Sequence, residues 1–137
     1  MSLRNFPFPS RAWKFLALAL VTSASFGARA DLLQECNGVA STINRSTPQQ
    51  IDQVTKLMNA ICVADGRGVM LIYRNNLSVP NGAVSQSNLD GIRPRMVKAW
   101  CTDPDQRTLL NMVDIQYTYS YPDGRLIGKI NITRRDC

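Results

Sequence analysis

Four cysteines constrain this 137-residue chain more strongly than any other residue type. Cys36, Cys62, Cys101 and Cys137 all follow an N-terminal segment typical of export signals. An even number of cysteines in a short exported chain predicts two disulfides, for which three pairings are available. We expect Cys36–Cys62 and Cys101–Cys137, because a returning C-terminal strand would bring the last residue back toward Cys101. The other two pairings would tie the N-terminal helices directly to a sheet.

Residues 1–30 resemble a cleavable leader. A basic start (Arg4, Arg11, Lys14) precedes the apolar run "FLALALVTSASF", and Ala28 and Ala30 occupy the small-residue positions of a signal-peptidase site. The apolar run is shorter than the ~20 residues that span a bilayer, so a membrane anchor is the weaker alternative. We predict cleavage near Ala30, no membrane span, and a location in the periplasm or outside the cell.

The remaining residues, 31–137, have the length of one small domain. Four of the 16 basic residues of the chain lie in the leader, so residues 31–137 carry 12 basic and 10 acidic residues. A nucleic-acid-binding protein needs a basic stripe that survives processing. This small excess of charge therefore argues against a nucleic-acid partner.

The N-terminal half predicts two helices. Residues 31–45 place Leu33, Cys36, Val39 and Ile43 on one helical face, although Gly38 weakens this helix. Residues 47–66 predict a second helix, with Thr47 as N-cap and Pro48 in its first turn. Its apolar residues recur at helical spacing, at positions 51, 54, 57, 58 and 61.

The C-terminal half mixes strands and helices. Residues 68–77 predict a strand and 78–87 a loop, and residues 87–100 predict a helix that Pro94 should kink or divide. Asp103 and Pro104 mark the start of a short helix, and alternating residues around "PDG" predict a β-hairpin near the C-terminus. We therefore predict a small α+β domain in which an antiparallel sheet, including this hairpin, packs against helices.

The chain contains no histidine, which removes the commonest general base and the commonest metal ligand. The cysteines lie 26, 39 and 36 residues apart, which excludes the paired spacing of a thiolate zinc site or a thioredoxin-like motif. Asp103 and Asp105 are explained by the start of a helix. We therefore predict no catalytic residues, no metal, no cofactor and no enzymatic activity.

Two groups of basic residues form a candidate partner surface. Arg93, Arg95 and Lys98 surround Pro94, and a second group lies on the last strand and the residues after it, at Lys129, Arg134 and Arg135. Folding of the sheet could bring the two groups together as a positive face for an anionic partner. The alternative is a solvated polar face on which Lys129 and Arg135 protect an edge strand.

The segment from Met96 to Cys137 resembles a family of small secreted Gram-negative proteins described as quorum-sensing-regulated virulence factors. The resemblance rests on "CTDPDQRTLL", on "VDIQYTYSYPDGRLIGKINI" and on the terminal cysteine. The matching residues are Cys101, Asp103, Pro104, Arg107, Leu109, Leu110, Tyr119, Asp123, Gly124 and Cys137. It implies a profilin-like α+β fold, secretion and a part in host interaction or virulence regulation, with no catalytic residues to transfer.

These features favour a non-enzymatic exported protein that binds an unidentified protein partner or acts as an accessory factor. One alternative is a periplasmic helper of a secretion system, similar to the pilotins that bind a secretin's tail. The missing lipid-attachment cysteine counts against it. Another alternative is an inhibitor of a hydrolase, for which "NNLSVPNGAVSQS" is the candidate inserting loop.

Overall fold

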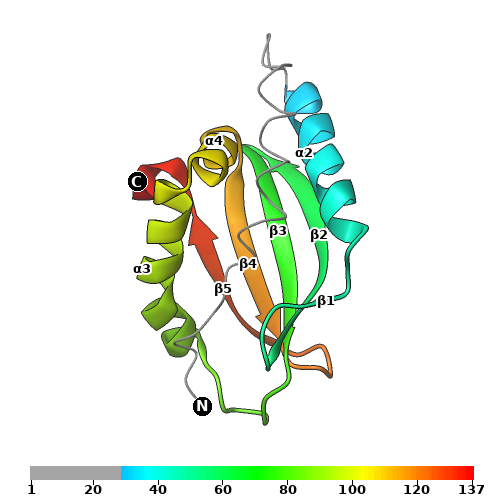
Figure 1. Cartoon of the computed structure of the whole chain (residues 1–137), viewed down its shortest axis with the longest axis vertical. Coiled ribbons are helices and arrows are strands. Elements are labelled where there is room, and N and C mark those ends of the chain that lie inside the picture. The colour runs from blue at the N-terminus through cyan, green and yellow to red at the C-terminus, as the bar shows by residue number, and fades with distance from the viewer. Residues whose placement is uncertain (1–28) are drawn as a thin grey trace.

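The computed structural model describes residues 29–137, which form one five-stranded sheet with three α-helices (Figure 1). The strands lie in the order β1-β2-β3-β4-β5. The elements are α2 (Arg29–Asn44), β1 (Gln49–Gln50), β2 (Thr55–Asp65), β3 (Gly68–Leu77), α3 (Gln86–Thr102), α4 (Pro104–Met112), β4 (Asp114–Ser120), β5 (Leu126–Ile132) and the 3-10 helix η2 (Arg134–Asp136). The predicted α+β class is confirmed. The predicted leader lies outside the described residues, apart from Arg29 and Ala30 at the start of α2.

Helix α2 forms where the sequence predicts it. Its buried face carries Cys36, Val39, Ala40 and Ile43, which pack against β2 and β3. A disulfide joins Cys36 to Cys62 on β2, with 6.0 Å between the Cα atoms. This bridge closes a 26-residue separation, for which loop entropy contributes roughly 3–4 kcal/mol.

The predicted helix over residues 47–66 is wrong, because this segment forms β1, a turn and β2. Thr47 lies just after α2 and does not start a new helix. Its hydroxyl donates to the carbonyl of Asn44, the last residue of α2. The carboxylate of Asp52 then accepts the N–H groups of Val54 and Thr55, an Asx turn that leads into β2.

A β-bulge interrupts the alternation of β2. The register of β2 against β3 shifts between Leu57 and Asn59, which inserts one residue into the alternation. The buried residues of β2 are consequently Thr55, Leu57 and Ala60, spaced first by two and then by three. The apolar residues that suggested a helix do not share one face, because Ile51 and Val54 precede β2 and Ile61 is exposed on the open face of the sheet.

Two helices carry the chain from β3 back to the start of β4. Residues 86–102 form α3 without a break at Pro94, so the predicted division of this helix is wrong. Asp103 caps α4, because its carboxylate accepts the N–H groups of Asp105 and Gln106, and Pro104 follows as predicted. This crossover makes β3 and β4 parallel, the one exception in an otherwise antiparallel sheet.

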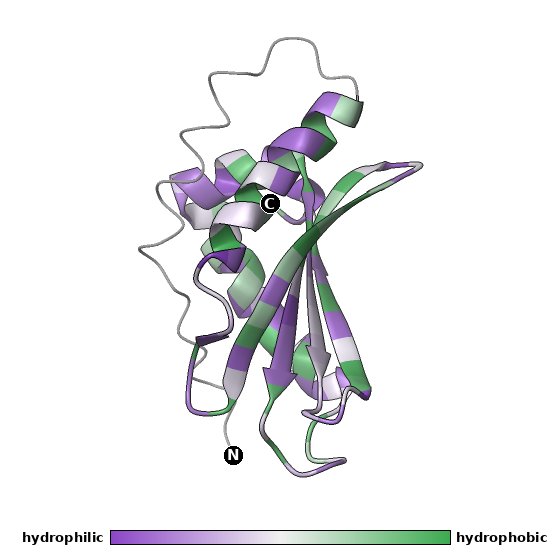
Figure 2. Cartoon of the chain, turned by 90° about the vertical axis from the view of Figure 1, so that its right-hand side faces the viewer, coloured by the Kyte–Doolittle hydropathy of each residue, from purple (hydrophilic) through white to green (hydrophobic). Residues whose placement is uncertain are grey.

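The helices cover one face of the sheet (Figure 2). Alternate residues of β3, β4 and β5 point into this layer and are buried, including Leu71, Tyr73, Ile115, Tyr119 and Ile130. The intervening residues lie on the opposite face, where β2 contributes the exposed Ile61 and Val63. The hairpin of β4 and β5 with one buried face is confirmed.

Amide side chains from the helices bind the backbones of the outer strand β5 and of β2 beyond its short pairing with β1. The side chain of Asn44 donates to the carbonyl of Ala60 at 2.8 Å and accepts its N–H at 2.7 Å. Gln86 makes the same pair of bonds with Lys129 on β5, at 2.7 and 2.9 Å. These bonds occupy groups that an edge strand would otherwise offer to another chain.

Gly128 allows α3 to approach β5 closely enough for the Gln86 contact. A Cβ atom at this position would overlap the Gln86 amide and lie 2.9 Å from Cδ1 of Leu89. Glycine is therefore required here by space rather than by backbone conformation.

We predict that Asn44→Ala lowers the free energy of unfolding by about 1–2 kcal/mol, because two hydrogen bonds to Ala60 are lost. Asn37→Ala is the matched control, since Asn37 is exposed on the same helix. Urea denaturation of both variants gives the comparison. Equal stability of the two variants would show that the Asn44 contact contributes nothing.

Candidate functional site: a groove at the end of the sheet

A groove of about 770 Å³ lies at the end of the sheet where α2 begins and α3 ends (Figure 1). Four segments line it, and we call it the end groove. They are Leu32 of α2, residues 67–69 at the β2–β3 turn, residues 110–114 from the end of α4 to the start of β4, and residues 133–135 near the C-terminus. Its volume lies within the range of binding pockets for small ligands or several side chains.

The end groove has a small apolar floor and a basic rim, and polar atoms make up most of its lining. Val69, Leu110 and Val113 are buried beneath it, while Leu32 and Met112 are half-buried on its walls. The rim carries three exposed arginines, Arg67, Arg134 and Arg135, and the lining holds a single carboxylate, Asp114. An apolar surface framed by charge is typical of protein-binding sites.

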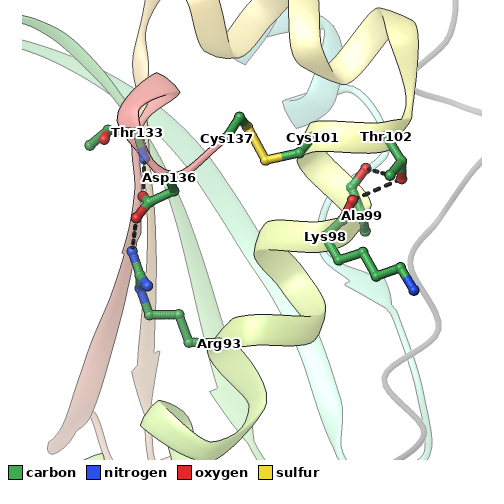
Figure 3. Close-up of a disulfide and its surroundings, with 8 residues drawn as sticks. All are labelled: Arg93, Lys98, Ala99, Cys101, Thr102, Thr133, Asp136 and Cys137. Carbon is green, nitrogen blue, oxygen red and sulfur yellow. Dashed lines mark hydrogen bonds and ion pairs between the residues drawn. A yellow bond between two sulfur atoms is a disulfide. The ribbon is translucent and has the colours of Figure 1, made fainter.

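Helix η2, which forms one wall of the end groove, is fixed by a disulfide. Cys137 is bonded to Cys101 in the last turn of α3, with 5.5 Å between the Cα atoms (Figure 3). The predicted pairing of all four cysteines is therefore confirmed, and neither Cys101 nor any other cysteine is a free thiol.

A polar network holds the same segment from the other side. Arg93 of α3 donates to a carboxylate oxygen of Asp136 at 2.7 Å and to the carbonyl of Asn131 at 3.0 Å. The other carboxylate oxygen of Asp136 accepts the N–H of Thr133 at 2.8 Å. Partial burial alone would raise the pKa of Asp136, but the Thr133 N–H and the Arg93 guanidinium lower it below its ordinary value.

The structure distributes the predicted basic surface over several places. Arg134 and Arg135 line the end groove, whereas Arg93 is held by Asp136. Arg95 and Lys98 are exposed on α3, and Figure 3 shows Lys98 pointing away from Arg93. Lys129 lies on β5. The six residues therefore do not form one compact cluster, and their role in partner binding stays a prediction.

Sequence reasoning missed Arg67 and the apolar part of the end groove. The predicted helix over 47–66 hid the β2–β3 turn that brings Arg67 to this end of the sheet. Leu110 and Met112 follow the predicted start of a helix at Asp103, but which surface they share with η2 depends on the crossover.

A second, shallower groove of about 550 Å³ follows the seam between α3 and β5. The polar groups that line it are already used to join the two elements, because Gln86 binds Lys129 and Asp90, and Arg93 binds Asn131. We therefore regard this seam as structural.

The loop considered for hydrolase inhibition is anchored to the domain. Val79 and Val84 are buried, and the Tyr121 hydroxyl donates to the carbonyl of Val84 and accepts the N–H of Gly82. Tyr121 itself is buried rather than exposed at the hairpin turn. An anchored loop has less freedom to insert into another protein's active site.

No group of acidic or cysteine side chains within residues 29–137 is arranged to hold a metal ion. In the interior, the side chains whose pKa values are most clearly shifted are tyrosines. Burial raises the pKa of Tyr73, Tyr117 and Tyr119, and the Tyr117 hydroxyl accepts a hydrogen bond from Nε1 of Trp100 at 3.0 Å. These rings stack as core residues, with 4.9 Å between the ring centres of Tyr73 and Tyr117.

The fold is shared with three solved proteins at low sequence identity. PA3611 of Pseudomonas aeruginosa, described as a secreted protein, aligns with a TM-score of 0.69 at 18% identity, covering 81% of this chain and 99% of that one. The type 2 secretion pilotin EpsS of Vibrio vulnificus aligns with a TM-score of 0.63 at 17% identity, and the alignment covers 80% of this chain and 94% of the pilotin. The type II secretion pilotin AspS of Vibrio cholerae aligns with a TM-score of 0.56 at 16% identity, and this alignment also covers 80% of this chain and 94% of the pilotin.

No protein-family model and no curated protein matches the chain. The resemblance of residues 96–137 to the virulence-factor family therefore stays a prediction. The two disulfides are typical of proteins that fold outside the cytoplasm. Within the described part of the chain, none of the helices has the length and apolar character needed to cross a membrane.

We predict that Arg93→Gln raises the pKa of Asp136 toward its ordinary value, because the guanidinium that favours the carboxylate is lost. A carboxyl pKa that is lowered by folding stabilises the folded state above the unfolded value, near pH 4, and this stabilisation disappears as the pH falls. The variant should therefore lose stability at neutral pH, by less than about 1 kcal/mol for this partly exposed ion pair, and the part of the loss that comes from the ion pair should disappear near pH 2.

Carboxyl titration by NMR and urea denaturation at both pH values measure this effect. Lys98→Gln removes a positive charge from the same helix, on a side that does not face Asp136 (Figure 3). An unchanged Asp136 pKa in Arg93→Gln, or an equal shift in Lys98→Gln, would contradict the role of the ion pair.

Proposed function

We propose that this protein is an exported, non-enzymatic helper of a secretion system that works by binding one protein partner. After cleavage near Ala30 it would act in the periplasm. The end groove is the observation that carries this proposal, since it combines an apolar floor with a charged rim on a covalently braced domain. Two pilotins of type II secretion systems share the fold, which supports a helper of this class over a general accessory factor.

The braced wall of the groove suits binding rather than catalysis. The Cys101–Cys137 bridge and the Arg93–Asp136 ion pair fix η2 before any partner arrives, so little ordering free energy is lost on association. The arginines of the rim could stabilise an anion, and Asp114 is the one carboxylate among the residues that line the groove.

The proposed partner is the C-terminal tail of a secretin. Such a tail would place apolar side chains on Leu32, Val69 and Met112, and the rim would orient it. This helper would meet the secretin tail in the periplasm, after the predicted cleavage near Ala30.

We predict that the purified protein, with its disulfides intact, retains a synthetic C-terminal secretin peptide from the same organism. Met112→Glu should weaken this binding at least about tenfold, because it places a charge against the apolar part of the groove. Leu126→Glu is the control, since Leu126 is 56% exposed on the hairpin and does not line the groove. Isothermal titration calorimetry measures both.

Absence of binding by the parent protein would remove the secretion-helper proposal. Binding that Met112→Glu and Leu126→Glu weaken equally would keep the proposal but place the peptide elsewhere. Circular dichroism of both variants shows whether they are folded.

A further inference from the structure

The three arginines on the rim of the end groove are not neutralised by neighbouring acids. Within residues 29–137 the ion pairs are Arg93–Asp136 and Arg125–Asp123, and neither involves Arg67, Arg134 or Arg135. These three side chains belong to exposed residues from two segments that meet only in the folded protein, the β2–β3 turn and η2.

The carboxylates closest in sequence to the rim are already engaged. Asp65 accepts the backbone N–H groups of Arg67 and Gly68, at 2.7 and 3.1 Å. Asp136 is bound by Arg93 and by the N–H of Thr133. Asp114 is the one acid among the residues that line the end groove, where it faces three arginines, so the lining itself carries more positive than negative charge.

We infer that the end groove binds an acidic amphipathic segment of a partner protein, with the apolar side chains of that segment on the floor and its carboxylates at the rim. This inference rests on the proposed function, because it names the chemistry of the partner that the same groove would bind. Arginines are suited to this role, since a guanidinium can bind a carboxylate with two parallel hydrogen bonds.

The shape of the site favours a peptide over an anionic membrane surface. The buried floor formed by Val69, Leu110 and Val113 lies between walls from α2 and η2. A narrow segment can enter such a groove, whereas a flat bilayer would meet the rim without reaching the floor. The charge at the rim should also speed association and make binding dependent on salt.

Two designed helical peptides test this inference. Both carry the same leucine face, and the positions that flank this face are glutamate in one peptide and lysine in the other. Fluorescence anisotropy with the purified, oxidised protein gives their affinities at low salt and at 0.5 M salt. We expect the glutamate peptide to bind about five- to tenfold more tightly at low salt, consistent with two or three exposed ion pairs, and to lose most of this advantage at high salt.

A charge-matched pair of variants locates the effect. Arg134→Glu/Arg135→Glu should remove the preference for the glutamate peptide. Lys56→Glu/Lys98→Glu changes the net charge equally at exposed residues outside the end groove and should keep the preference. Equal affinity for the two peptides, or equal loss in both double variants, would overturn the inference. So would tighter binding to anionic lipid vesicles than to the glutamate peptide, with the same dependence on Arg134 and Arg135.

Failure here is distinguishable from failure of the proposed function. If a secretin tail binds but the designed peptides are not discriminated, the secretion-helper proposal stands without this chemistry. If the glutamate peptide binds through Arg134 and Arg135 but no secretin tail does, the groove chemistry stands and the partner belongs to another class.

Discussion

The attachment of the helices to a single face of the sheet is the constraint on which the rest of the structure depends. The helices cover one face, and α2 and α3 are each fixed to one side of the sheet (Figure 1). The Cys36–Cys62 bridge ties α2 to β2, and Cys101–Cys137 ties α3 to the residues that follow β5. The amides of Asn44 and Gln86 add a pair of hydrogen bonds at each of these strands.

The same attachments create the end groove. Because Cys101 lies in the last turn of α3, its bridge holds η2 beside the loop between α4 and β4. The β2–β3 turn and the start of α2 close the groove from the other side. The groove is thus a consequence of covalent bracing at the end of the sheet, and its basic rim is prepositioned.

The sequence predicted most elements that depend on local signals. Asp103 and Pro104 marked α4, the alternation around "PDG" marked the hairpin, and the placement of Cys137 after a returning strand indicated its bridge to Cys101. The strand β2 could not be recognised, because apolar residues from the preceding loop, at Ile51 and Val54, and from both faces of the bulged strand happen to recur at helical spacing. Because β2 was not predicted, the sequence also could not show that Arg67 lines the same groove as Arg134 and Arg135. This placement depends on the order of the strands.

The central claim is that partners bind at the end groove, and chemical-shift mapping of a bound peptide tests it most directly. The account predicts the largest amide shifts at residues 67–69, 110–114 and 133–135. The seam between α3 and β5, including Gln86 and Lys129, should change little. Shifts concentrated on that seam or on the open sheet face around Ile61 and Val63, with an unperturbed end groove, would contradict the account.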